Sequence, residues 1–206
     1  MIHKDFFDYE LSEALRDLAF FKADESINYI KIHDICLSEF TKPTFNKEGR
    51  FSEGPRGFRN EYEKYVQSHL MEPSKSRNPC IYIFEVVESD TDILRTYVDF
   101  IDSQKASPNR RNCSSINLNR KKGLNKHEQS ILYVGKSEKP IDGRIVVHFG
   151  YYEKGVAGLQ LVYWGKDINL KINLHVFEFI DKKSQRYLEV IEKLFFVQLN
   201  PIIGKR

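Results

Sequence analysis

The sequence predicts an α+β fold in which a small three-stranded sheet, mixed or antiparallel, is flanked by helices. Three short runs are rich in β-branched and aromatic residues and are typical of strands: 80–87 (CIYIFEVV), 130–135 (SILYVG) and 172–180 (INLHVFEFI). Apolar residues recur at three- and four-residue intervals over 93–101, 141–149 and 184–199, which indicates amphipathic helices. Strands separated by helices favour a single mixed layer.

A Pro-rich polar stretch at 73–79 (PSKSRNP) predicts a joint between two parts of the chain. Residues 1–79 are interpreted as an N-terminal helical region, because 3–22 and 58–70 carry helical periodicity while 27–40 fits neither period. Residues 80–206 form the second domain, with a long insertion at about 88–129 between its first two strands.

Composition sets broad limits on the function. The 206 residues are 41% hydrophobic, enough for a buried core, and a net charge of +3 does not by itself indicate a nucleic-acid-binding protein. Cys36, Cys80 and Cys113 lie far apart without a C-x-x-C pair, which argues against a disulfide framework or a structural zinc site. The acidic N-terminus lacks the apolar run of a signal peptide, and no stretch is long enough to cross a bilayer. We expect a reduced, cytoplasmic setting without a membrane.

The last helix places one acid, Glu192, on its apolar stripe. The stripe consists of Leu188, Ile191, Phe195 and Leu199. Glu189 instead has polar helical neighbours and belongs on a solvated face. Removing an unpaired carboxylate from water is costly, so Glu192 needs a cation or hydrogen-bond donors. The plainer alternative is a carboxylate at the edge of the stripe in a surface salt bridge.

Arg144 and His148 are four residues apart and share one face of their predicted helix. An arginine fork suits a phosphate group, and a histidine one turn later can hydrogen-bond or transfer a proton. A surface arginine beside a half-buried histidine is the alternative. The nearby Gly-Lys-Ser at 135–137 is no phosphate-binding Walker A loop, because Ser130 stands where that motif requires glycine.

Together these features resemble the GIY-YIG endonuclease family over residues 80–204. The two name-giving strands appear as Cys80-Ile81-Tyr82 and Tyr133-Val134-Gly135, with Cys80 in place of the first glycine and Val134 in place of the central isoleucine. The connection between them is much longer than the family's usual hairpin loop, which loop-closure entropy tolerates because it grows only logarithmically with length.

The resemblance extends through the second half of the chain. The family's helix arginine matches Arg144, and the His or Tyr one turn later matches His148. The metal-binding glutamate, nine residues before a proline in the DNA-repair members, matches Glu192 and Pro201. Gly204 stands where an asparagine often follows.

The resemblance implies phosphodiester hydrolysis with one divalent ion, Mg²⁺ or Mn²⁺, bound by Glu192, while Arg144 holds a nonbridging phosphate oxygen. It implies that Tyr82 takes a proton from the attacking water, helped by the positive charge of Lys136, which would lower the tyrosine's pKa. Tyr133 would position the water or phosphate, and His148 would orient a tyrosine or relay its proton. Ordinary strand packing is the alternative role of both tyrosines.

The insertion supplies local positive charge, since 103–127 contains basic residues and no acid. The residues that we expect to contact DNA are Arg110, Arg111, Arg120, Lys121 and Lys122. A solvated loop is the alternative.

The leading interpretation is a metal-dependent, restriction-type DNA endonuclease whose partner is double-stranded DNA, with a homodimer left open. A nucleic-acid-binding protein with a degenerate nuclease fold is the alternative from another class. A structure-specific repair or mobile-element nuclease would share the chemistry and differ in substrate.

Overall fold

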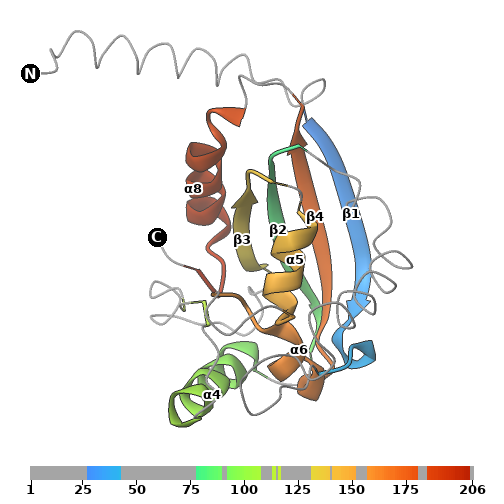
Figure 1. Cartoon of the computed structure of the whole chain (residues 1–206), viewed down its shortest axis with the longest axis vertical. Coiled ribbons are helices and arrows are strands. Elements are labelled where there is room, and N and C mark those ends of the chain that lie inside the picture. The colour runs from blue at the N-terminus through green and yellow to red at the C-terminus, as the bar shows by residue number, and fades with distance from the viewer. Residues whose placement is uncertain are drawn as a thin grey trace, which may run out of the picture.

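A computed structural model describes residues 27–42, 78–89, 92–107, 113–114, 116, 131–139, 141–151, 157–180 and 185–204. It shows an α+β fold in which helices lie against an antiparallel sheet (Figure 1). The strands are β1 (Ile27–Cys36), β2 (Cys80–Glu88), β3 (Ile131–Ser137) and β4 (Lys171–Phe179). The sheet has four strands in the order β1-β4-β2-β3, so the prediction of three strands is corrected.

The described helices are α4 (Ile93–Ala106), α5 (Asp142–Phe149), α6 (Leu161–Trp164) and α8 (Leu188–Leu199), with 3-10 turns η1 (Leu37–Glu39) and η4 (Lys166–Ile168). The helices α4, α5 and α8 agree in position with the periodic runs of the sequence, and α6 is additional to those runs. No helix among the described residues is long and apolar enough to cross a membrane.

The additional strand, β1, comes from the stretch that fitted neither period in the sequence. Its pairing with β4 is interrupted by a bulge between Ile32 and Ile35, where Asp34 adopts a positive φ of 53°. The extra residue shifts the inward-facing positions by one, so the alternation begun by Ile30 and Ile32 breaks before Ile35. A part of the region 1–79 that was assigned to helices therefore belongs to the sheet. The helices predicted at 3–22 and 58–70 lie outside the described residues.

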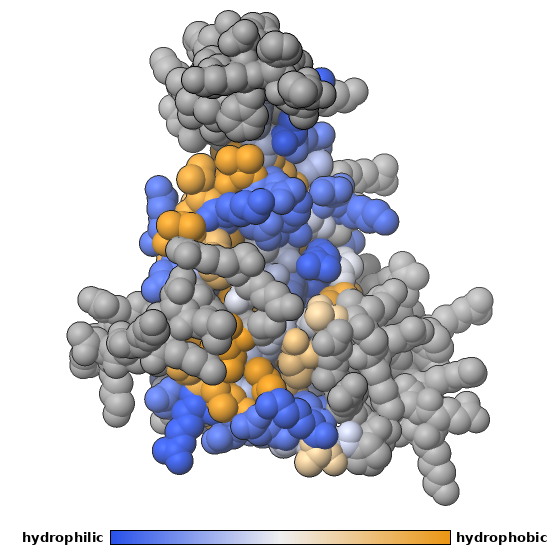
Figure 2. Space-filling view, turned by 90° about the vertical axis from the view of Figure 1, so that its left-hand side faces the viewer, coloured by the Kyte–Doolittle hydropathy of each residue, from blue (hydrophilic) through white to orange (hydrophobic). Residues whose placement is uncertain are grey.

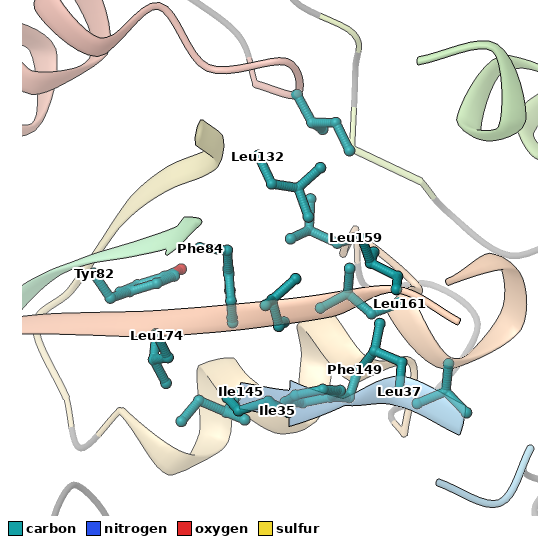
Figure 3. Packing of buried hydrophobic residues seen from close by; sticks show 14 of the residues in the cluster. Ile35, Leu37, Tyr82, Phe84, Leu132, Ile145, Phe149, Leu159, Leu161 and Leu174 are labelled. Carbon is teal, nitrogen blue, oxygen red and sulfur yellow. The ribbon is translucent and has the colours of Figure 1, made fainter. Parts of the chain in front are cut away.

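The two faces of the sheet pack against different helices. Tyr82 and Phe84 of β2 point into the main core, where Ile145 and Phe149 of α5 meet them (Figure 3). The residues between them face the opposite way: Ile81, Ile83 and Val134 pack with Leu188 and Ile191 of α8. Because successive side chains of a strand point to opposite faces, β2 supplies both cores.

The long insertion returns to the sheet at its outer edge. Tyr97 of α4 donates a hydrogen bond to the Ser114 carbonyl at 2.8 Å, and the Ser114 amide donates to the Gly158 carbonyl at 2.9 Å. Ile116 forms a bridge with Ile203. The C-terminal segment in turn lies along β3, where the Ile203 amide donates to the Leu132 carbonyl at 2.9 Å. The described part of the insertion is thus held beside β3.

Candidate active site

The pairing of β2 with β3 brings the two motif tyrosines together. Tyr82 lies opposite Gly135, and Tyr133 lies opposite Phe84. The centroids of the two tyrosine rings are 6.1 Å apart. Tyr82 is fully buried, whereas Tyr133 is partly exposed at the sheet's outer strand.

Gly135 provides the space in which the Tyr82 ring lies. A Cβ atom at this position would stand 2.6 Å from the Tyr82 hydroxyl and 2.6 Å from Cε1 of Tyr133. Real Cβ atoms do not approach other atoms so closely, because the interior is close-packed. Gly135 was part of the sequence motif, but only the pairing of the strands shows that its missing side chain leaves room for the two tyrosine rings.

Helix α5 presents Arg144 and His148 to the same tyrosines. Nε2 of His148 lies 2.8 Å from the Tyr82 hydroxyl, and Nε of Arg144 donates to that hydroxyl at 3.4 Å. The His148 ring also lies 4.7 Å from the Tyr133 ring, centroid to centroid. Gly150 ends the helix in a left-handed conformation just after these residues. The predicted sharing of one helical face by Arg144 and His148 is therefore confirmed.

Burial keeps both phenols protonated. Removal from water raises the pKa of Tyr82 well above its ordinary value, and the nearby charge and hydrogen bond of Arg144 oppose this shift only in part. Burial likewise raises the pKa of Tyr133, with Arg144 opposing and Glu192 adding to the rise. The expectation that Lys136 supplies the positive charge at Tyr82 is thus corrected, since the cation that contacts Tyr82 is Arg144.

His148 is a neutral imidazole at neutral pH. Burial, followed by the positive charge of Arg144, lowers its pKa to about 3. Its Nδ1 is buried and has no hydrogen-bond partner. Orphaned buried N–H groups are rare, so we assign the proton to Nε2, which donates to the Tyr82 oxygen.

Glu192 approaches the tyrosines from α8. It is half-buried, and burial raises its pKa, opposed by the charge of Lys136, by a hydrogen bond from the Lys136 backbone and by Arg144. Its charge in turn acts on both Tyr133 and Arg144. Among the described residues no cation forms an ion pair with Glu192 within 4.0 Å, so the negative charge of this half-buried carboxylate has no cationic partner in contact.

Glu189 and Lys136 have a different arrangement. Glu189 is exposed and pairs with Lys193 at 2.8 Å, which confirms the solvated face predicted for it. Lys136 Nζ lies 3.8 Å from Glu189 and 3.5 Å from Glu138. Lys136 therefore forms ion pairs with the acidic residues near α8, and its ammonium group does not contact Tyr82.

A lone carboxylate fits one kind of metal ion. Within the parts of the chain that the structure describes, no group of three or more His, Cys, Asp or Glu side chains could hold an ion together. Mg²⁺ commonly binds through one or two carboxylates, retaining several waters and taking phosphate oxygens from the substrate. The desolvated carboxylate of Glu192 matches that requirement.

The sequence-predicted site residues thus converge from four elements, β2, β3, α5 and α8, on the edge of the sheet formed by β3. They are Tyr82, Tyr133, Lys136, Arg144, His148 and Glu192. The five predicted DNA-binding residues, Arg110, Arg111, Arg120, Lys121 and Lys122, lie outside the described residues. Sequence reasoning missed the contribution of Ser114 and Ile116, which no local pattern marks as points where the insertion attaches.

No model of a known protein family, no curated protein and no solved structure matches this chain.

We predict that Gly135→Ala lowers the free energy of unfolding by about 1–3 kcal/mol, because the added methyl group must displace a tyrosine ring. The matched control is Gly143→Ala in α5, where a Cβ would meet nothing within 4 Å. It should leave stability unchanged or raise it by up to about 1 kcal/mol, since alanine favours the helix. Urea unfolding measures both. Equal effects of the two substitutions would show that the tyrosines do not need the space at Gly135.

We predict that stability falls on acidification because of His148. The imidazole's folded pKa is about 3 and its ordinary value is 6.5, so between these pH values only the unfolded chain binds the proton. The stability that the neutral imidazole contributes is therefore complete above pH 6.5 and is lost as the pH falls toward 3, by about 1.4 kcal/mol per pH unit. The unfolding free energy of His148→Gln should fall less steeply between pH 6 and 4. Parallel pH profiles for the wild type and the variant would contradict the assignment.

Proposed function

We propose that this protein is a metal-dependent endonuclease of the GIY-YIG type that hydrolyses phosphodiester bonds in double-stranded DNA, and that it acts as a restriction-type enzyme. The observation that carries the proposal is the contact of Tyr82 with both Arg144 and His148, with Glu192 acting on Tyr133 and Arg144 from another helix. One hydrogen-bond partner satisfies a buried tyrosine hydroxyl, so a charged guanidinium in addition to a histidine is more than strand packing requires.

Arg144 is the group that holds the phosphate. Its guanidinium is half-buried and its pKa is raised, first by the electrostatic influence of Tyr82, so it stays charged. Its Nε donates a hydrogen bond of 3.4 Å to the Tyr82 hydroxyl, and the guanidinium also lowers the pKa of Tyr133. The remaining N–H groups of the fork suit a nonbridging phosphate oxygen, and a fixed cation in a partly dry site stabilises developing charge strongly.

Tyr82 is the group that receives the proton of the attacking water, and because burial keeps the phenol protonated it must first lose its own proton and act as the phenolate. With its proton on Nε2, His148 donates to the Tyr82 oxygen, and Arg144 donates to the same oxygen. The nearby Tyr82 hydroxyl lowers the pKa of Tyr133 in part. Two donors on one phenol oxygen stabilise its phenolate, the form able to accept a proton, while Tyr133 positions the water or phosphate.

The divalent ion, Mg²⁺ or Mn²⁺, would be held by Glu192. When bound it would stabilise charge on the scissile phosphate and on the leaving oxygen. Lys136 orients Glu192 through its backbone hydrogen bond and partly balances its charge.

The position of the insertion in the fold favours DNA as the substrate, because its attached part lies close to the site. Ile116 bridges Ile203, and Ile203 bridges Tyr133 of the site. Basic residues flank the attached part in the sequence, with Arg110 and Arg111 on one side and Arg120 to Lys122 on the other. We propose that they bind DNA phosphates.

Incubation of the full chain with plasmid DNA, with and without Mg²⁺, tests the proposal. Discrete bands that require the ion support a restriction-type enzyme. Binding without cleavage would support the degenerate nuclease fold, which the joint presence of Tyr82, Tyr133, Arg144 and Glu192 disfavours. Cleavage of branched or nicked substrates alone would support a repair or mobile-element nuclease.

We predict that Glu192→Gln abolishes cleavage and leaves folding and DNA binding largely intact, because only the negative charge at the proposed metal site is removed. Glu189→Gln is the matched control, three residues earlier on the same helix, and should be nearly silent. Cleavage assays and duplex binding in Ca²⁺ measure the two effects. Loss of activity in the Glu189 variant with retention in the Glu192 variant would place the metal elsewhere.

We predict that Arg144→Ala slows single-turnover cleavage by a factor on the order of 10² or more, as the loss of a preorganised charge does. Arg144→Lys should restore little, since a point charge cannot reproduce the planar fork. An undiminished single-turnover rate in either variant would remove Arg144 from the chemistry.

We predict that replacing the basic residues of the insertion weakens DNA binding and flattens its dependence on salt. The replaced residues are Arg110, Arg111, Arg120, Lys121 and Lys122. For every phosphate that is no longer neutralised, the slope of log K against log salt should decrease by roughly 0.9. Binding to a short duplex in Ca²⁺ at several salt concentrations measures this slope. An unchanged slope would show that these residues do not bind DNA phosphates and that the insertion is a solvated loop.

A further inference from the structure

Helix α8 is apolar on its outer side as well as on its inner side. Val190, Leu194 and Val197 are 45%, 49% and 57% exposed, and their spacing of four and three residues places them on one stripe. This stripe lies opposite the Leu188 and Ile191 side that packs on the sheet. Figure 2, which views the molecule from the side on which α8 lies in Figure 1, shows hydrophobic surface exposed on that side. Exposed apolar residues that gather in one stripe mark a surface that another segment can cover.

A row of aromatic rings continues this surface across the sheet. The Phe195 ring of α8 stacks on Phe177 of β4 with centroids 5.7 Å apart, and Phe177 meets Tyr29 of β1 at 4.9 Å. Tyr29 is 50% exposed. Helix α8 packs on β3 and β2, so this row extends beyond the strands that α8 covers. The open apolar surface therefore consists of Tyr29, Phe177, Phe195, Val190, Leu194 and Val197.

We propose that the N-terminal segment, residues 3–22, covers this open apolar surface as an amphipathic helix. Its sequence has a matching apolar stripe, which consists of Phe7, Leu11, Ala14, Leu18 and Phe21. The described chain begins at Ile27, which pairs with Phe179 and packs into the same cluster as Leu188 of α8. The segment thus enters the sheet at the border of the surface that needs cover.

The dimensions agree with this placement. Residues 23–26 span at most roughly 14 Å when extended, which brings the end of the segment next to the start of β1. A helix of twenty residues is about 30 Å long, and the ten-residue strand β1 is about 33 Å long. A helix that lies back along β1, beside α8, would therefore cross the aromatic row and cover the β1–β4 side of the open surface, including Tyr29 and Phe177.

A second copy of the chain is the less suitable occupant. Stable interfaces bury about 800 Å² on each partner and involve roughly 20–30 residues a side, and the open apolar surface has six side chains. A segment of the same chain also docks intramolecularly, at a high effective concentration set by the short linker, whereas a second copy must be supplied by the protein in solution.

A double-mutant cycle in the full chain tests the proposal. Leu18→Gln and Leu194→Gln each remove one side of the contact, and glutamine keeps a helix propensity close to that of leucine. Each should lower the urea midpoint of unfolding by about 0.3–1 M, and the double variant should fall no further than the lower single variant. Leu18→Gln combined with Lys193→Gln, an exposed residue of α8 outside the surface, is the control pair, whose effects should add.

Two results would overturn the proposal. One is a Leu194→Gln midpoint equal to that of the wild type, or additive effects of Leu18→Gln and Leu194→Gln, either of which would leave the stripe without this partner. The other is a concentration-dependent dimer in sedimentation that Leu194→Gln dissociates and Leu18→Gln leaves intact, which would make a second copy the occupant. The readout is stability and mass, so it is independent of any nuclease activity.

Discussion

The antiparallel register of β2 on β3 is the constraint on which the site depends. Tyr82 reaches α5 only because Gly135, the residue opposite it, has no side chain. A slip of one residue would turn every side chain of β3 to the other face, so that Tyr133 would point toward α8 and lose the His148 ring. Both faces of β2 are buried against apolar residues, and these contacts hold the register in place. A slip of one residue would exchange the side chains of the two faces and disrupt the packing of both cores.

The exclusion of water from this edge of the sheet decides the charges of the site. The same burial raises the pKa of Tyr82 and lowers that of His148, so both side chains are neutral at neutral pH. The charges that remain close to the tyrosines are those of Arg144 and Glu192, which come from helices on opposite faces of the sheet. The tyrosine pair thus lies between a fixed cation and a fixed anion, and the surrounding core prevents either from relaxing away.

The sequence predicts those parts of the molecule whose pattern is local. Runs rich in β-branched and aromatic residues located β2 and β4, helical spacing located α5 and α8, and the anomaly of a carboxylate on an apolar stripe singled out Glu192. The bulge at Asp34 broke the alternation of β1, so that strand was not recognised. The identity of the cation at Tyr82 depends on how α5 crosses the sheet, which no spacing along the chain encodes, and Lys136 was therefore chosen in place of Arg144.

The strand order has a consequence for how the protein is made. Strand β4 lies between β1 and β2, and Tyr29 of β1 bonds to His175 of β4, 146 positions later in the chain. A ribosome that adds 5–20 residues per second needs roughly 7–30 s to cover that distance. During this interval the nascent β1 and β2 have no partner between them, and their unpaired edges are the kind of surface that aggregates. Because α8 is synthesised after β4, the tyrosine pair and Glu192 come together only when translation is nearly complete, and the growing chain passes most of its synthesis without a finished site.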